Sequence, residues 1–534
     1  MGRESEGRAA STLPPVSDAI EPISAKSKRT PLMEMLVIAA PTVAAMTSYT
    51  LMQFVDKLMV SRIGPDPIYV GAQGNGGLWA FVPISVAMGC LTVVNTYVAQ
   101  NLGAKTPEKA PAYCWAGLWL SLVWWIVFMI PYGVALPHLL EIVRGEPLDS
   151  NGLDPAKLQE LAQLRLRDSF AGEYGRILIF GSIFTMAARG VAQYFYGMHK
   201  PMVVLAASAT GNLVNFVLNT MLIFGPHAPA STGHALPDWW FHTAAHMAAA
   251  LGIEAQHMRG SAMATVIGTC VELCIPMAVF LSPRFNRLYG TVRAWRPSRD
   301  HMADLLRIGW PGALMFGNEM ICWTIFMVVQ VGHFGPHHST AGWIAHQWMS
   351  LSFMPTYGIS VAITAMVGES LGANKPQEAA ARAGLGLRVA VAYMSLCGVC
   401  FVLFRRDLID LFIEPNTRPE ERAELLALGA SFLIATAAFQ FFDGVAMSLS
   451  GALRGAGDTR WPGIATIILS WTVIVGGGWA MVYFAPGLRS IGPWIAAATY
   501  IILLSLALAW RFLGGAWQRM HLLRDAEKSH THVH

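Results

Sequence analysis

The chain contains 534 residues, of which 54% are hydrophobic and only 13% are charged. A chain this apolar is not an ordinary soluble protein, and a formal net charge of +4 is too small to favour nucleic acid as a partner. We therefore predict an all-α polytopic membrane protein whose surroundings are the lipid bilayer.

Twelve apolar stretches are long enough to cross a bilayer, since a span needs roughly 20 residues. They lie at about 34–60, 68–99, 112–137, 174–197, 202–225, 258–282, 309–333, 342–369, 383–404, 427–452, 462–484 and 491–512. An even number of spans places both termini on one side of the membrane. Lysine and arginine crowd both chain ends and the link at 283–307, which predicts that this side is the cytoplasm.

The first span carries an acid, Asp56, about 30 Å along the helix from Leu36 at 1.5 Å per residue. This depth places the carboxylate in the outer half of the membrane. An acid inside a span is functional by default. The neighbouring Lys57 leaves a second interpretation open, in which the two side chains form a snorkelling pair near the interface.

The fifth span carries three amides at spacings of three and four, Asn212, Asn215 and Asn219, so all three share one helix face. This face must point inward, either as hydrogen-bonding glue between helices or as the lining of a hydrated cavity. Asn219 lies about 27 Å from Pro201, close to the level calculated for Asp56.

Other polar segments allow more than one interpretation. Span four carries Arg189, and span six carries Glu272, which either packs against a neighbouring polar side chain or has a function. An amphipathic stretch at 155–167 is expected to lie on the outer surface. The outer segment at 226–257 is rich in histidine, but His242 and His246 have no third ligand at a fixed offset, so we predict no metal site.

The second half of the chain repeats the first. Leu102-Gly-Ala-Lys-Thr-Pro107 matches Leu371-Gly-Ala-Asn-Lys-Pro376, and two further pairs of motifs match at offsets of about 260 to 271 residues. An offset of six spans preserves orientation, as in the parallel repeats of secondary transporters. We divide the chain into a disordered cytoplasmic tail at 1–32, an N-terminal six-helix lobe at 33–282, a cytoplasmic linker at 283–308, a C-terminal six-helix lobe at 309–514 and a cytoplasmic tail at 515–534.

Two acids in the second half share one depth. Glu319 lies about 15 Å past Gly309, the expected start of its span, and Asp443 lies about 16 Å before Arg454. Two carboxylates at one level on separate helices are what a coupling-cation site requires. The sequence contains no Walker-type motif, so the expected energy source is an ion gradient.

The order and spacing of several motifs resemble the MATE (multidrug and toxic compound extrusion) transporters over about 33–512. These motifs are Val55-Asp56 with Gly64, Gly197 with Lys200-Pro201, Asn215-Phe-Val-Leu-Asn219 with Phe224-Gly225, Ala345-His346-Gln347, Phe353-Met354-Pro355, and Leu453-Arg454-Gly455 with Asp458. The histidine motif and the acids Glu319 and Asp443 are similar to the NorM-like branch.

The resemblance implies an inner-membrane antiporter, not an enzyme, that exports organic cations in exchange for sodium or protons and needs no cofactor. It also implies that Glu319, Asp443 and Asp56 handle the coupling cation. We assign the substrate cavity to five residues and expect a monomer. These cavity residues are Asn215, Asn219, Gln347, Phe439 and Gln440.

Two departures from the NorM-like pattern bear on this assignment. Phe439 stands where that pattern has tyrosine, which removes one oxygen ligand, and Lys57 stands where threonine is common. Two alternative functions remain: a lipid-linked oligosaccharide flippase of related fold, which should line its cavity with several basic residues, and a membrane-embedded enzyme, for which only the outer histidines offer candidates.

Overall fold

The computed structural model describes residues 30–63, 68–144, 155–227, 238–413, 418–520 and 522–523. Twelve helices in these ranges are long and apolar enough to cross a membrane, which confirms the predicted number of spans and the all-α fold. The predicted N-terminal tail lies almost wholly outside the described residues.

The first half of the chain forms the N-terminal lobe. Its helices are α2 (Pro31–Val60), α3 (Ile68–Leu91), α4 (Val93–Gly103), α5 (Ala110–Trp124), α6 (Ile130–Arg144), α7 (Pro155–Gly197), α8 (Pro201–Phe224), α9 (Asp238–Ala250) and α10 (His257–Leu281). A π-helical turn, Trp125–Met129, joins α5 to α6 within one span.

The second half forms a short connecting segment and the C-terminal lobe. Its helices are α11 (Pro283–Tyr289), α12 (Arg299–Thr324), α13 (Pro336–Gly372), α14 (Pro376–Leu403), α15 (Arg405–Asp410), α16 (Pro419–Ala456), α17 (Arg460–Leu469), α18 (Gly478–Phe484) and α19 (Ile491–Leu513). Two π-helical segments, Ile325–Val331 after α12 and Ser470–Gly477 after α17, continue their spans.

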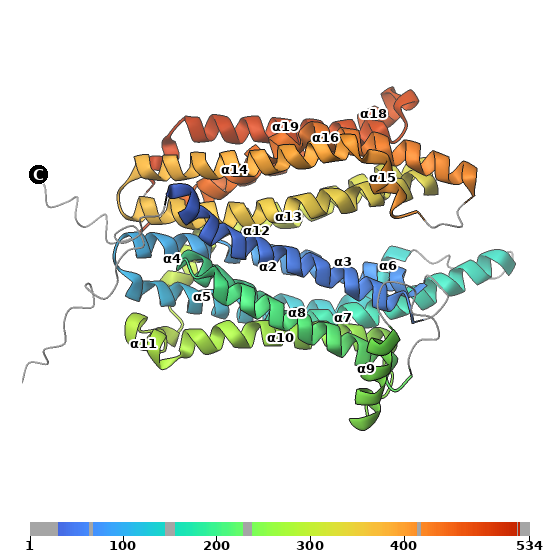
Figure 1. Ribbon diagram of the computed structural model, residues 1–534, viewed down its shortest axis with the longest axis horizontal. Helices are drawn as coiled ribbons and strands as arrows, with labels where there is room; N and C mark the ends of the chain where they lie inside the picture. The colour runs from blue at the N-terminus through green and yellow to red at the C-terminus, as the bar shows by residue number, and fades with distance from the viewer. Residues whose placement is uncertain are drawn as a thin grey trace, which may run out of the picture.

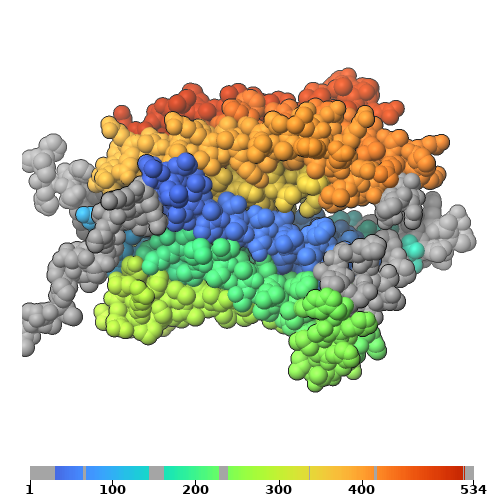
Figure 2. Space-filling model, in the orientation of Figure 1, coloured from blue at the N-terminus to red at the C-terminus, as the bar shows by residue number. Residues whose placement is uncertain are grey.

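The two lobes lie one above the other with their helices roughly parallel to the long axis (Figure 1). The start of α2, the end of α19 and the connecting α11 all lie at the left end of this view, which we call the N/C end; the right end is the opposite end. Figure 2 shows α2 lying between the two lobes on this face. Accordingly, α2 packs against α8 of its own lobe and α13 of the other.

Tight turns return the chain at the N/C end, and three of them share one design. Lys105, His199 and Asn374 each adopt a positive φ, between 55° and 60°. A proline follows two residues later and begins the next helix, where its missing N–H costs no hydrogen bond. The sequence of these turns therefore sets the ends of the spans.

The repeat predicted from the sequence is present as a pseudo-twofold contact between the lobes. A Cβ added to Gly103 would lie 1.9 Å from the Glu369 carbonyl oxygen, and one added to Gly372 would lie 2.1 Å from the Gln100 carbonyl oxygen. The same interval, 269 residues, separates Gly103 from Gly372 and Gln100 from Glu369. Each lobe thus presents the same small residue to the other, as a twofold interface requires.

Two boundaries differ from the prediction. The amphipathic stretch at 155–167 is not a separate surface helix, because α7 continues through it without a break; no proline occurs between Pro155 and Pro201 to stop it. The seventh span begins at Arg299, ten residues before its expected start, so the predicted linker at 283–308 includes the first turns of α12.

Candidate functional site

The structure brings Glu319 of α12 and Asp443 of α16 together in the C-terminal lobe, close enough for their charges to interact. Both side chains are partly buried. The hydroxyl group of Tyr500, on α19, donates a hydrogen bond to Glu319 Oε1 at 3.1 Å. Three helices therefore converge on one acidic centre, as the depth calculation predicted for the two acids.

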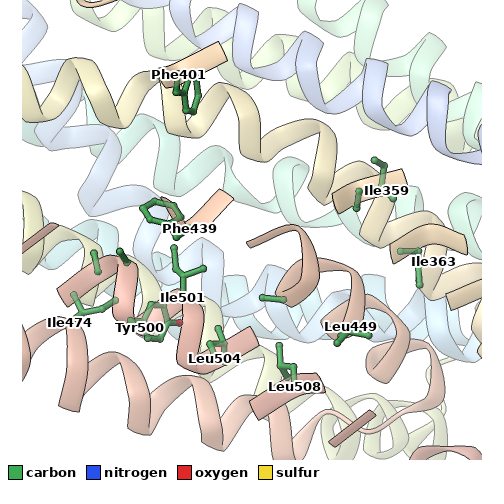
Figure 3. Close-up of a cluster of buried hydrophobic side chains, with 14 of the residues drawn as sticks. Ile359, Ile363, Phe401, Phe439, Leu449, Ile474, Tyr500, Ile501, Leu504 and Leu508 are labelled. Carbon is green, nitrogen blue, oxygen red and sulfur yellow. The ribbon is translucent and has the colours of Figure 1, made fainter. Parts of the chain in front are cut away.

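Sequence reasoning missed Tyr500. Phe439 offers no oxygen because its side chain is a hydrocarbon, and its ring is fully buried in the core of the C-terminal lobe. Figure 3 shows Phe439, Tyr500 and Ile501 within this cluster of buried side chains. Tyr500 thus supplies a hydroxyl group from another helix. The available signal was a single tyrosine after the small residues 496–499 in an otherwise apolar span.

Distorted helices support the acidic centre. Asn318, beside Glu319, donates a hydrogen bond to Ser470 Oγ at 2.7 Å and accepts one from Trp471 Nε1 at 2.6 Å. Ser470 and Trp471 open a π-helical segment, and Gln330 donates to two backbone carbonyl groups inside it. Such π-helical turns occur frequently at functional sites.

A second polar centre lies in the N-terminal lobe. Asn219 donates hydrogen bonds to Asp56 Oδ1 and, at 3.2 Å, to Asn215 Oδ1, and Asn215 donates to Thr265 Oγ1 at 3.4 Å. Asp56 is 5% exposed, whereas its neighbour Lys57 is exposed. Asp56 and Asn219, which the helix arithmetic put at one level, are therefore in contact. This contact favours the first of the two interpretations of Asp56 over a snorkelling pair with Lys57.

The polar face of α8 continues toward the N/C end. Asn212 donates a hydrogen bond to Ser48 Oγ at 2.5 Å, and Ser208 donates to Glu272 Oε1 at 2.9 Å. Together with Asn215 and Asn219, these residues join α8 to α2 and α10 along one face. In this conformation the asparagine face forms interhelical hydrogen bonds, the first of the two interpretations of that face.

The remaining residues assigned to the substrate cavity do not share one open surface. Gln440 is 1% exposed and donates a hydrogen bond to Ser352 Oγ at 2.8 Å, and Phe439 is enclosed beside it. Gln347 lies partly buried on α13, and Asn215 and Asn219 are enclosed in the other lobe. Polarity along a helix identifies an inward face, but neighbouring helices decide whether that face is open.

Hydrogen bonds close the N/C half of the bundle between the lobes. Side chains of α4 donate to backbone carbonyl groups of α13 and α16: Asn95 to Val361 O, Thr96 to Arg454 O at 2.9 Å, and Gln100 to Gly455 O at 3.1 Å. At the same end, Arg382 bridges Glu369 of its own lobe at 2.7 Å and Glu34 of the other at 3.5 Å.

Comparison with known proteins agrees with this architecture. The MatE family model matches residues 41–221 and 314–477, more than half of the chain. The chain belongs to the MATE family. It is 29% identical to the multidrug resistance protein NorM of Burkholderia vietnamiensis, over 89% of this chain and 92% of that protein.

A further relative, a probable multidrug resistance protein NorM of Pseudomonas syringae pv. tomato, is 27% identical over 92% of this MATE chain and 95% of its own length. Among solved structures, an outward-facing MATE family transporter matches with a TM-score of 0.75 and 19% identity, over 92% of this chain and 98% of that one. These matches place the MATE chain in the NorM-like branch and confirm its fold.

The histidine pair of the MATE chain, His242 and His246, lies apart from both polar centres. His242 and His246 are exposed on α9, which projects from the bundle near the opposite end (Figure 1). In the described ranges, no three histidine, cysteine, aspartate or glutamate side chains gather closely enough to hold a metal ion. His234 lies outside the described residues.

Proposed function

We propose that this MATE chain is a secondary active multidrug efflux antiporter that exports organic cations in exchange for sodium ions or protons. The pairing of Glu319 with Asp443 carries the proposal. Two carboxylates whose charges interact inside a membrane repel each other, and burial makes each charge costly. A bound sodium ion or proton relieves both effects, so the pair has a reason to take up a cation.

Cation uptake drives transport only if the cation binds one conformation more tightly than the other. The acidic centre is built from α12, α16 and α19, and two of these helices also take part in contacts between the lobes: α12 packs against α3, and the end of α16 accepts hydrogen bonds from α4. A change in charge at the pair therefore acts on helices that hold the N/C half closed.

We infer the orientation from the distribution of basic residues. The N/C end carries the arginine-rich link, so it faces the cytoplasm of a bacterial-type inner membrane, with both termini inside. The conformation described above is then closed toward the cytoplasm. The transporter works as a monomer, and no cofactor besides the coupling ion takes part.

Purified protein in proteoliposomes tests the proposal. A fluorescent organic cation is loaded, and sodium and proton gradients are imposed separately; we expect one of them to drive dye movement against its own gradient. Glu319→Gln and Asp443→Asn should each abolish this coupled movement while the protein remains monodisperse, because an amide keeps the shape but lacks the negative charge that attracts a sodium ion or a proton. The proposal would be refuted if neither gradient changed the dye movement, or if coupled dye movement persisted in both variants.

A further inference from the structure

A histidine lies buried in the contact between the two lobes at the N/C end. His199 occupies the turn between α7 and α8, and its side chain is 1% exposed. Across the interface, its Nδ1 atom lies 3.8 Å from Glu369 Oε2, near the end of α13. No described residue forms a hydrogen bond with either ring nitrogen of this histidine. A buried polar group without a partner is costly, so packing alone does not account for His199.

The pseudo-twofold relation between the lobes shows what is unusual about this contact. Gln100 occupies the position equivalent to Glu369, 269 residues earlier in the chain. The Gln100 amide donates a hydrogen bond to Gly455 O of the C-terminal lobe at 3.1 Å, and an amide does not change its charge with pH. On the other side of the axis, a carboxylate meets an imidazole instead. One of the two related contacts between the lobes is therefore titratable.

Carboxylates outnumber cations in the charged cluster to which Glu369 belongs. Five side chains from the start of α2, the end of α13 and the start of α14 form it: Glu34, Glu369, Lys375, Glu378 and Arg382. Arg382 lies 2.7 Å from Glu369 Oε2, the same oxygen that faces His199. Burial opposes a charge on the imidazole, but an unbalanced carboxylate beside it favours that charge. A proton on His199 supplies the positive charge that the cluster lacks.

The other elements around this turn hold their charged groups elsewhere. Neither α4, which packs against α7, nor α8 carries a charged residue. Arg189 is the nearest charged residue before His199 on α7, about 15 Å away along the chain. Lys200 lies against α11, where its charge interacts with that of Arg284. Of the acids that the structure describes, only Glu369 lies within ion-pair distance of a His199 ring nitrogen.

We propose that His199 and Glu369 form a proton-binding site that stabilises the closed N/C end. In the closed form, a shift of about 1 Å brings the protonated imidazole close enough to donate a charge-assisted hydrogen bond to Glu369. When the lobes part at this end, both side chains reach water and the bond is lost. The closed form thus binds the proton more tightly, so a fall in pH favours closure. Because His199 lies between two spans, the site senses pH on the N/C side of the membrane.

The related turns of the chain supply the variants that test this site. Lys105 and Asn374 adopt the same positive φ as His199, so lysine and asparagine both fit this backbone. His199→Asn removes the titratable group, whereas His199→Lys keeps a positive charge at every pH of the experiment. His337→Asn is the control, because His337 pairs with Glu424 at 2.7 Å at the opposite end.

Hydrogen exchange of the full-length protein in lipid nanodiscs is measured at about pH 5 and about pH 8, between which histidine changes its charge. The readout is the exchange rate of α4 and of the last turns of α13 in a variant, divided by that of the unaltered protein at the same pH. This ratio cancels the pH dependence of the exchange chemistry and of the acidic pair.

The two variants should respond at opposite ends of the pH range. His199→Asn should exchange roughly tenfold faster than the unaltered protein at about pH 5, as expected for a lost hydrogen bond between charged groups, and equally fast at about pH 8. His199→Lys should exchange at the unaltered rate at about pH 5 and roughly tenfold more slowly at about pH 8. The ratio for His337→Asn should be one at both pH values.

The contrary results are distinct. A ratio that is the same at both pH values, in either His199 variant, would show that His199 is structural and would overturn the proton site. A change with pH in His337→Asn that equals the change in His199→Asn would also overturn it. Where Glu369→Gln is already present, His199→Asn should no longer alter exchange at either pH. A roughly tenfold change in that double variant would rule out Glu369 as the partner and overturn the pairing.

Discussion

The closure of the N/C half depends on the absence of a side chain at Gly372, so Gly372→Ala should weaken it. The Cβ atom of alanine would lie 2.1 Å from the Gln100 carbonyl oxygen of the other lobe. Gly372 lies at the end of α13 without a positive φ, so alanine fits the local backbone, and the clash with α4 is the main effect.

The size of the effect follows from this contact. Real Cβ atoms hardly ever approach another atom closer than 3.0 Å, so α4 and α13 must separate by about 1 Å. The 3.1 Å hydrogen bond from Gln100 to Gly455 O then lengthens beyond a useful distance. Overpacking of this kind costs about 1–3 kcal/mol, which shifts the balance between closed and open forms by about 5–150-fold.

Hydrogen exchange measured by mass spectrometry in lipid nanodiscs is the assay. Amide groups in α4 (93–103) and in the last turns of α13 should exchange faster by up to the shift in the balance between closed and open forms, about 5–150-fold, since exchange follows local opening. Gly384→Ala is the control, because an added Cβ there meets nothing within 4 Å and alanine favours a helix. If Gly372→Ala exchanged at the rate of the unaltered protein in both segments, the reasoning about the contact between the lobes would be wrong.

Four further predictions follow from the polar centres and the chain ends. Tyr500→Phe should lower the affinity for the coupling ion by roughly tenfold, since it removes a charge-assisted hydrogen bond; titration of efflux against ion concentration measures this. Asp56→Asn should impair efflux, and unaltered efflux would exclude a role for this acid. Asn219→Ala should impair efflux more than Asn212→Ala, because Asn219 donates a hydrogen bond to Asp56 whereas Asn212 donates to Ser48; an equal loss in the two variants would contradict this. Removal of the residues before Thr30 should leave efflux unchanged at equal membrane levels, which a truncated protein tests directly.

The sequence alone determined the class of the protein, the number of its spans and its internal repeat. Apolar stretches of sufficient length are a local property, and the bilayer imposes the helix because every backbone polar group must bond within its own segment. Depth along a span also follows from local spacing, since each residue adds a constant rise. The common depth of Glu319 and Asp443, and that of Asp56 and Asn219, were therefore predictable.

The tertiary structure decided which partner each inward side chain meets. Tyr500 reaches Glu319 from a helix that lies 181 residues away in the chain, and no spacing rule connects residues on different helices. The same limit applies to exposure. Phe439 and Gln440 lie on an inward face, but the packing of helices distant in sequence enclosed both side chains.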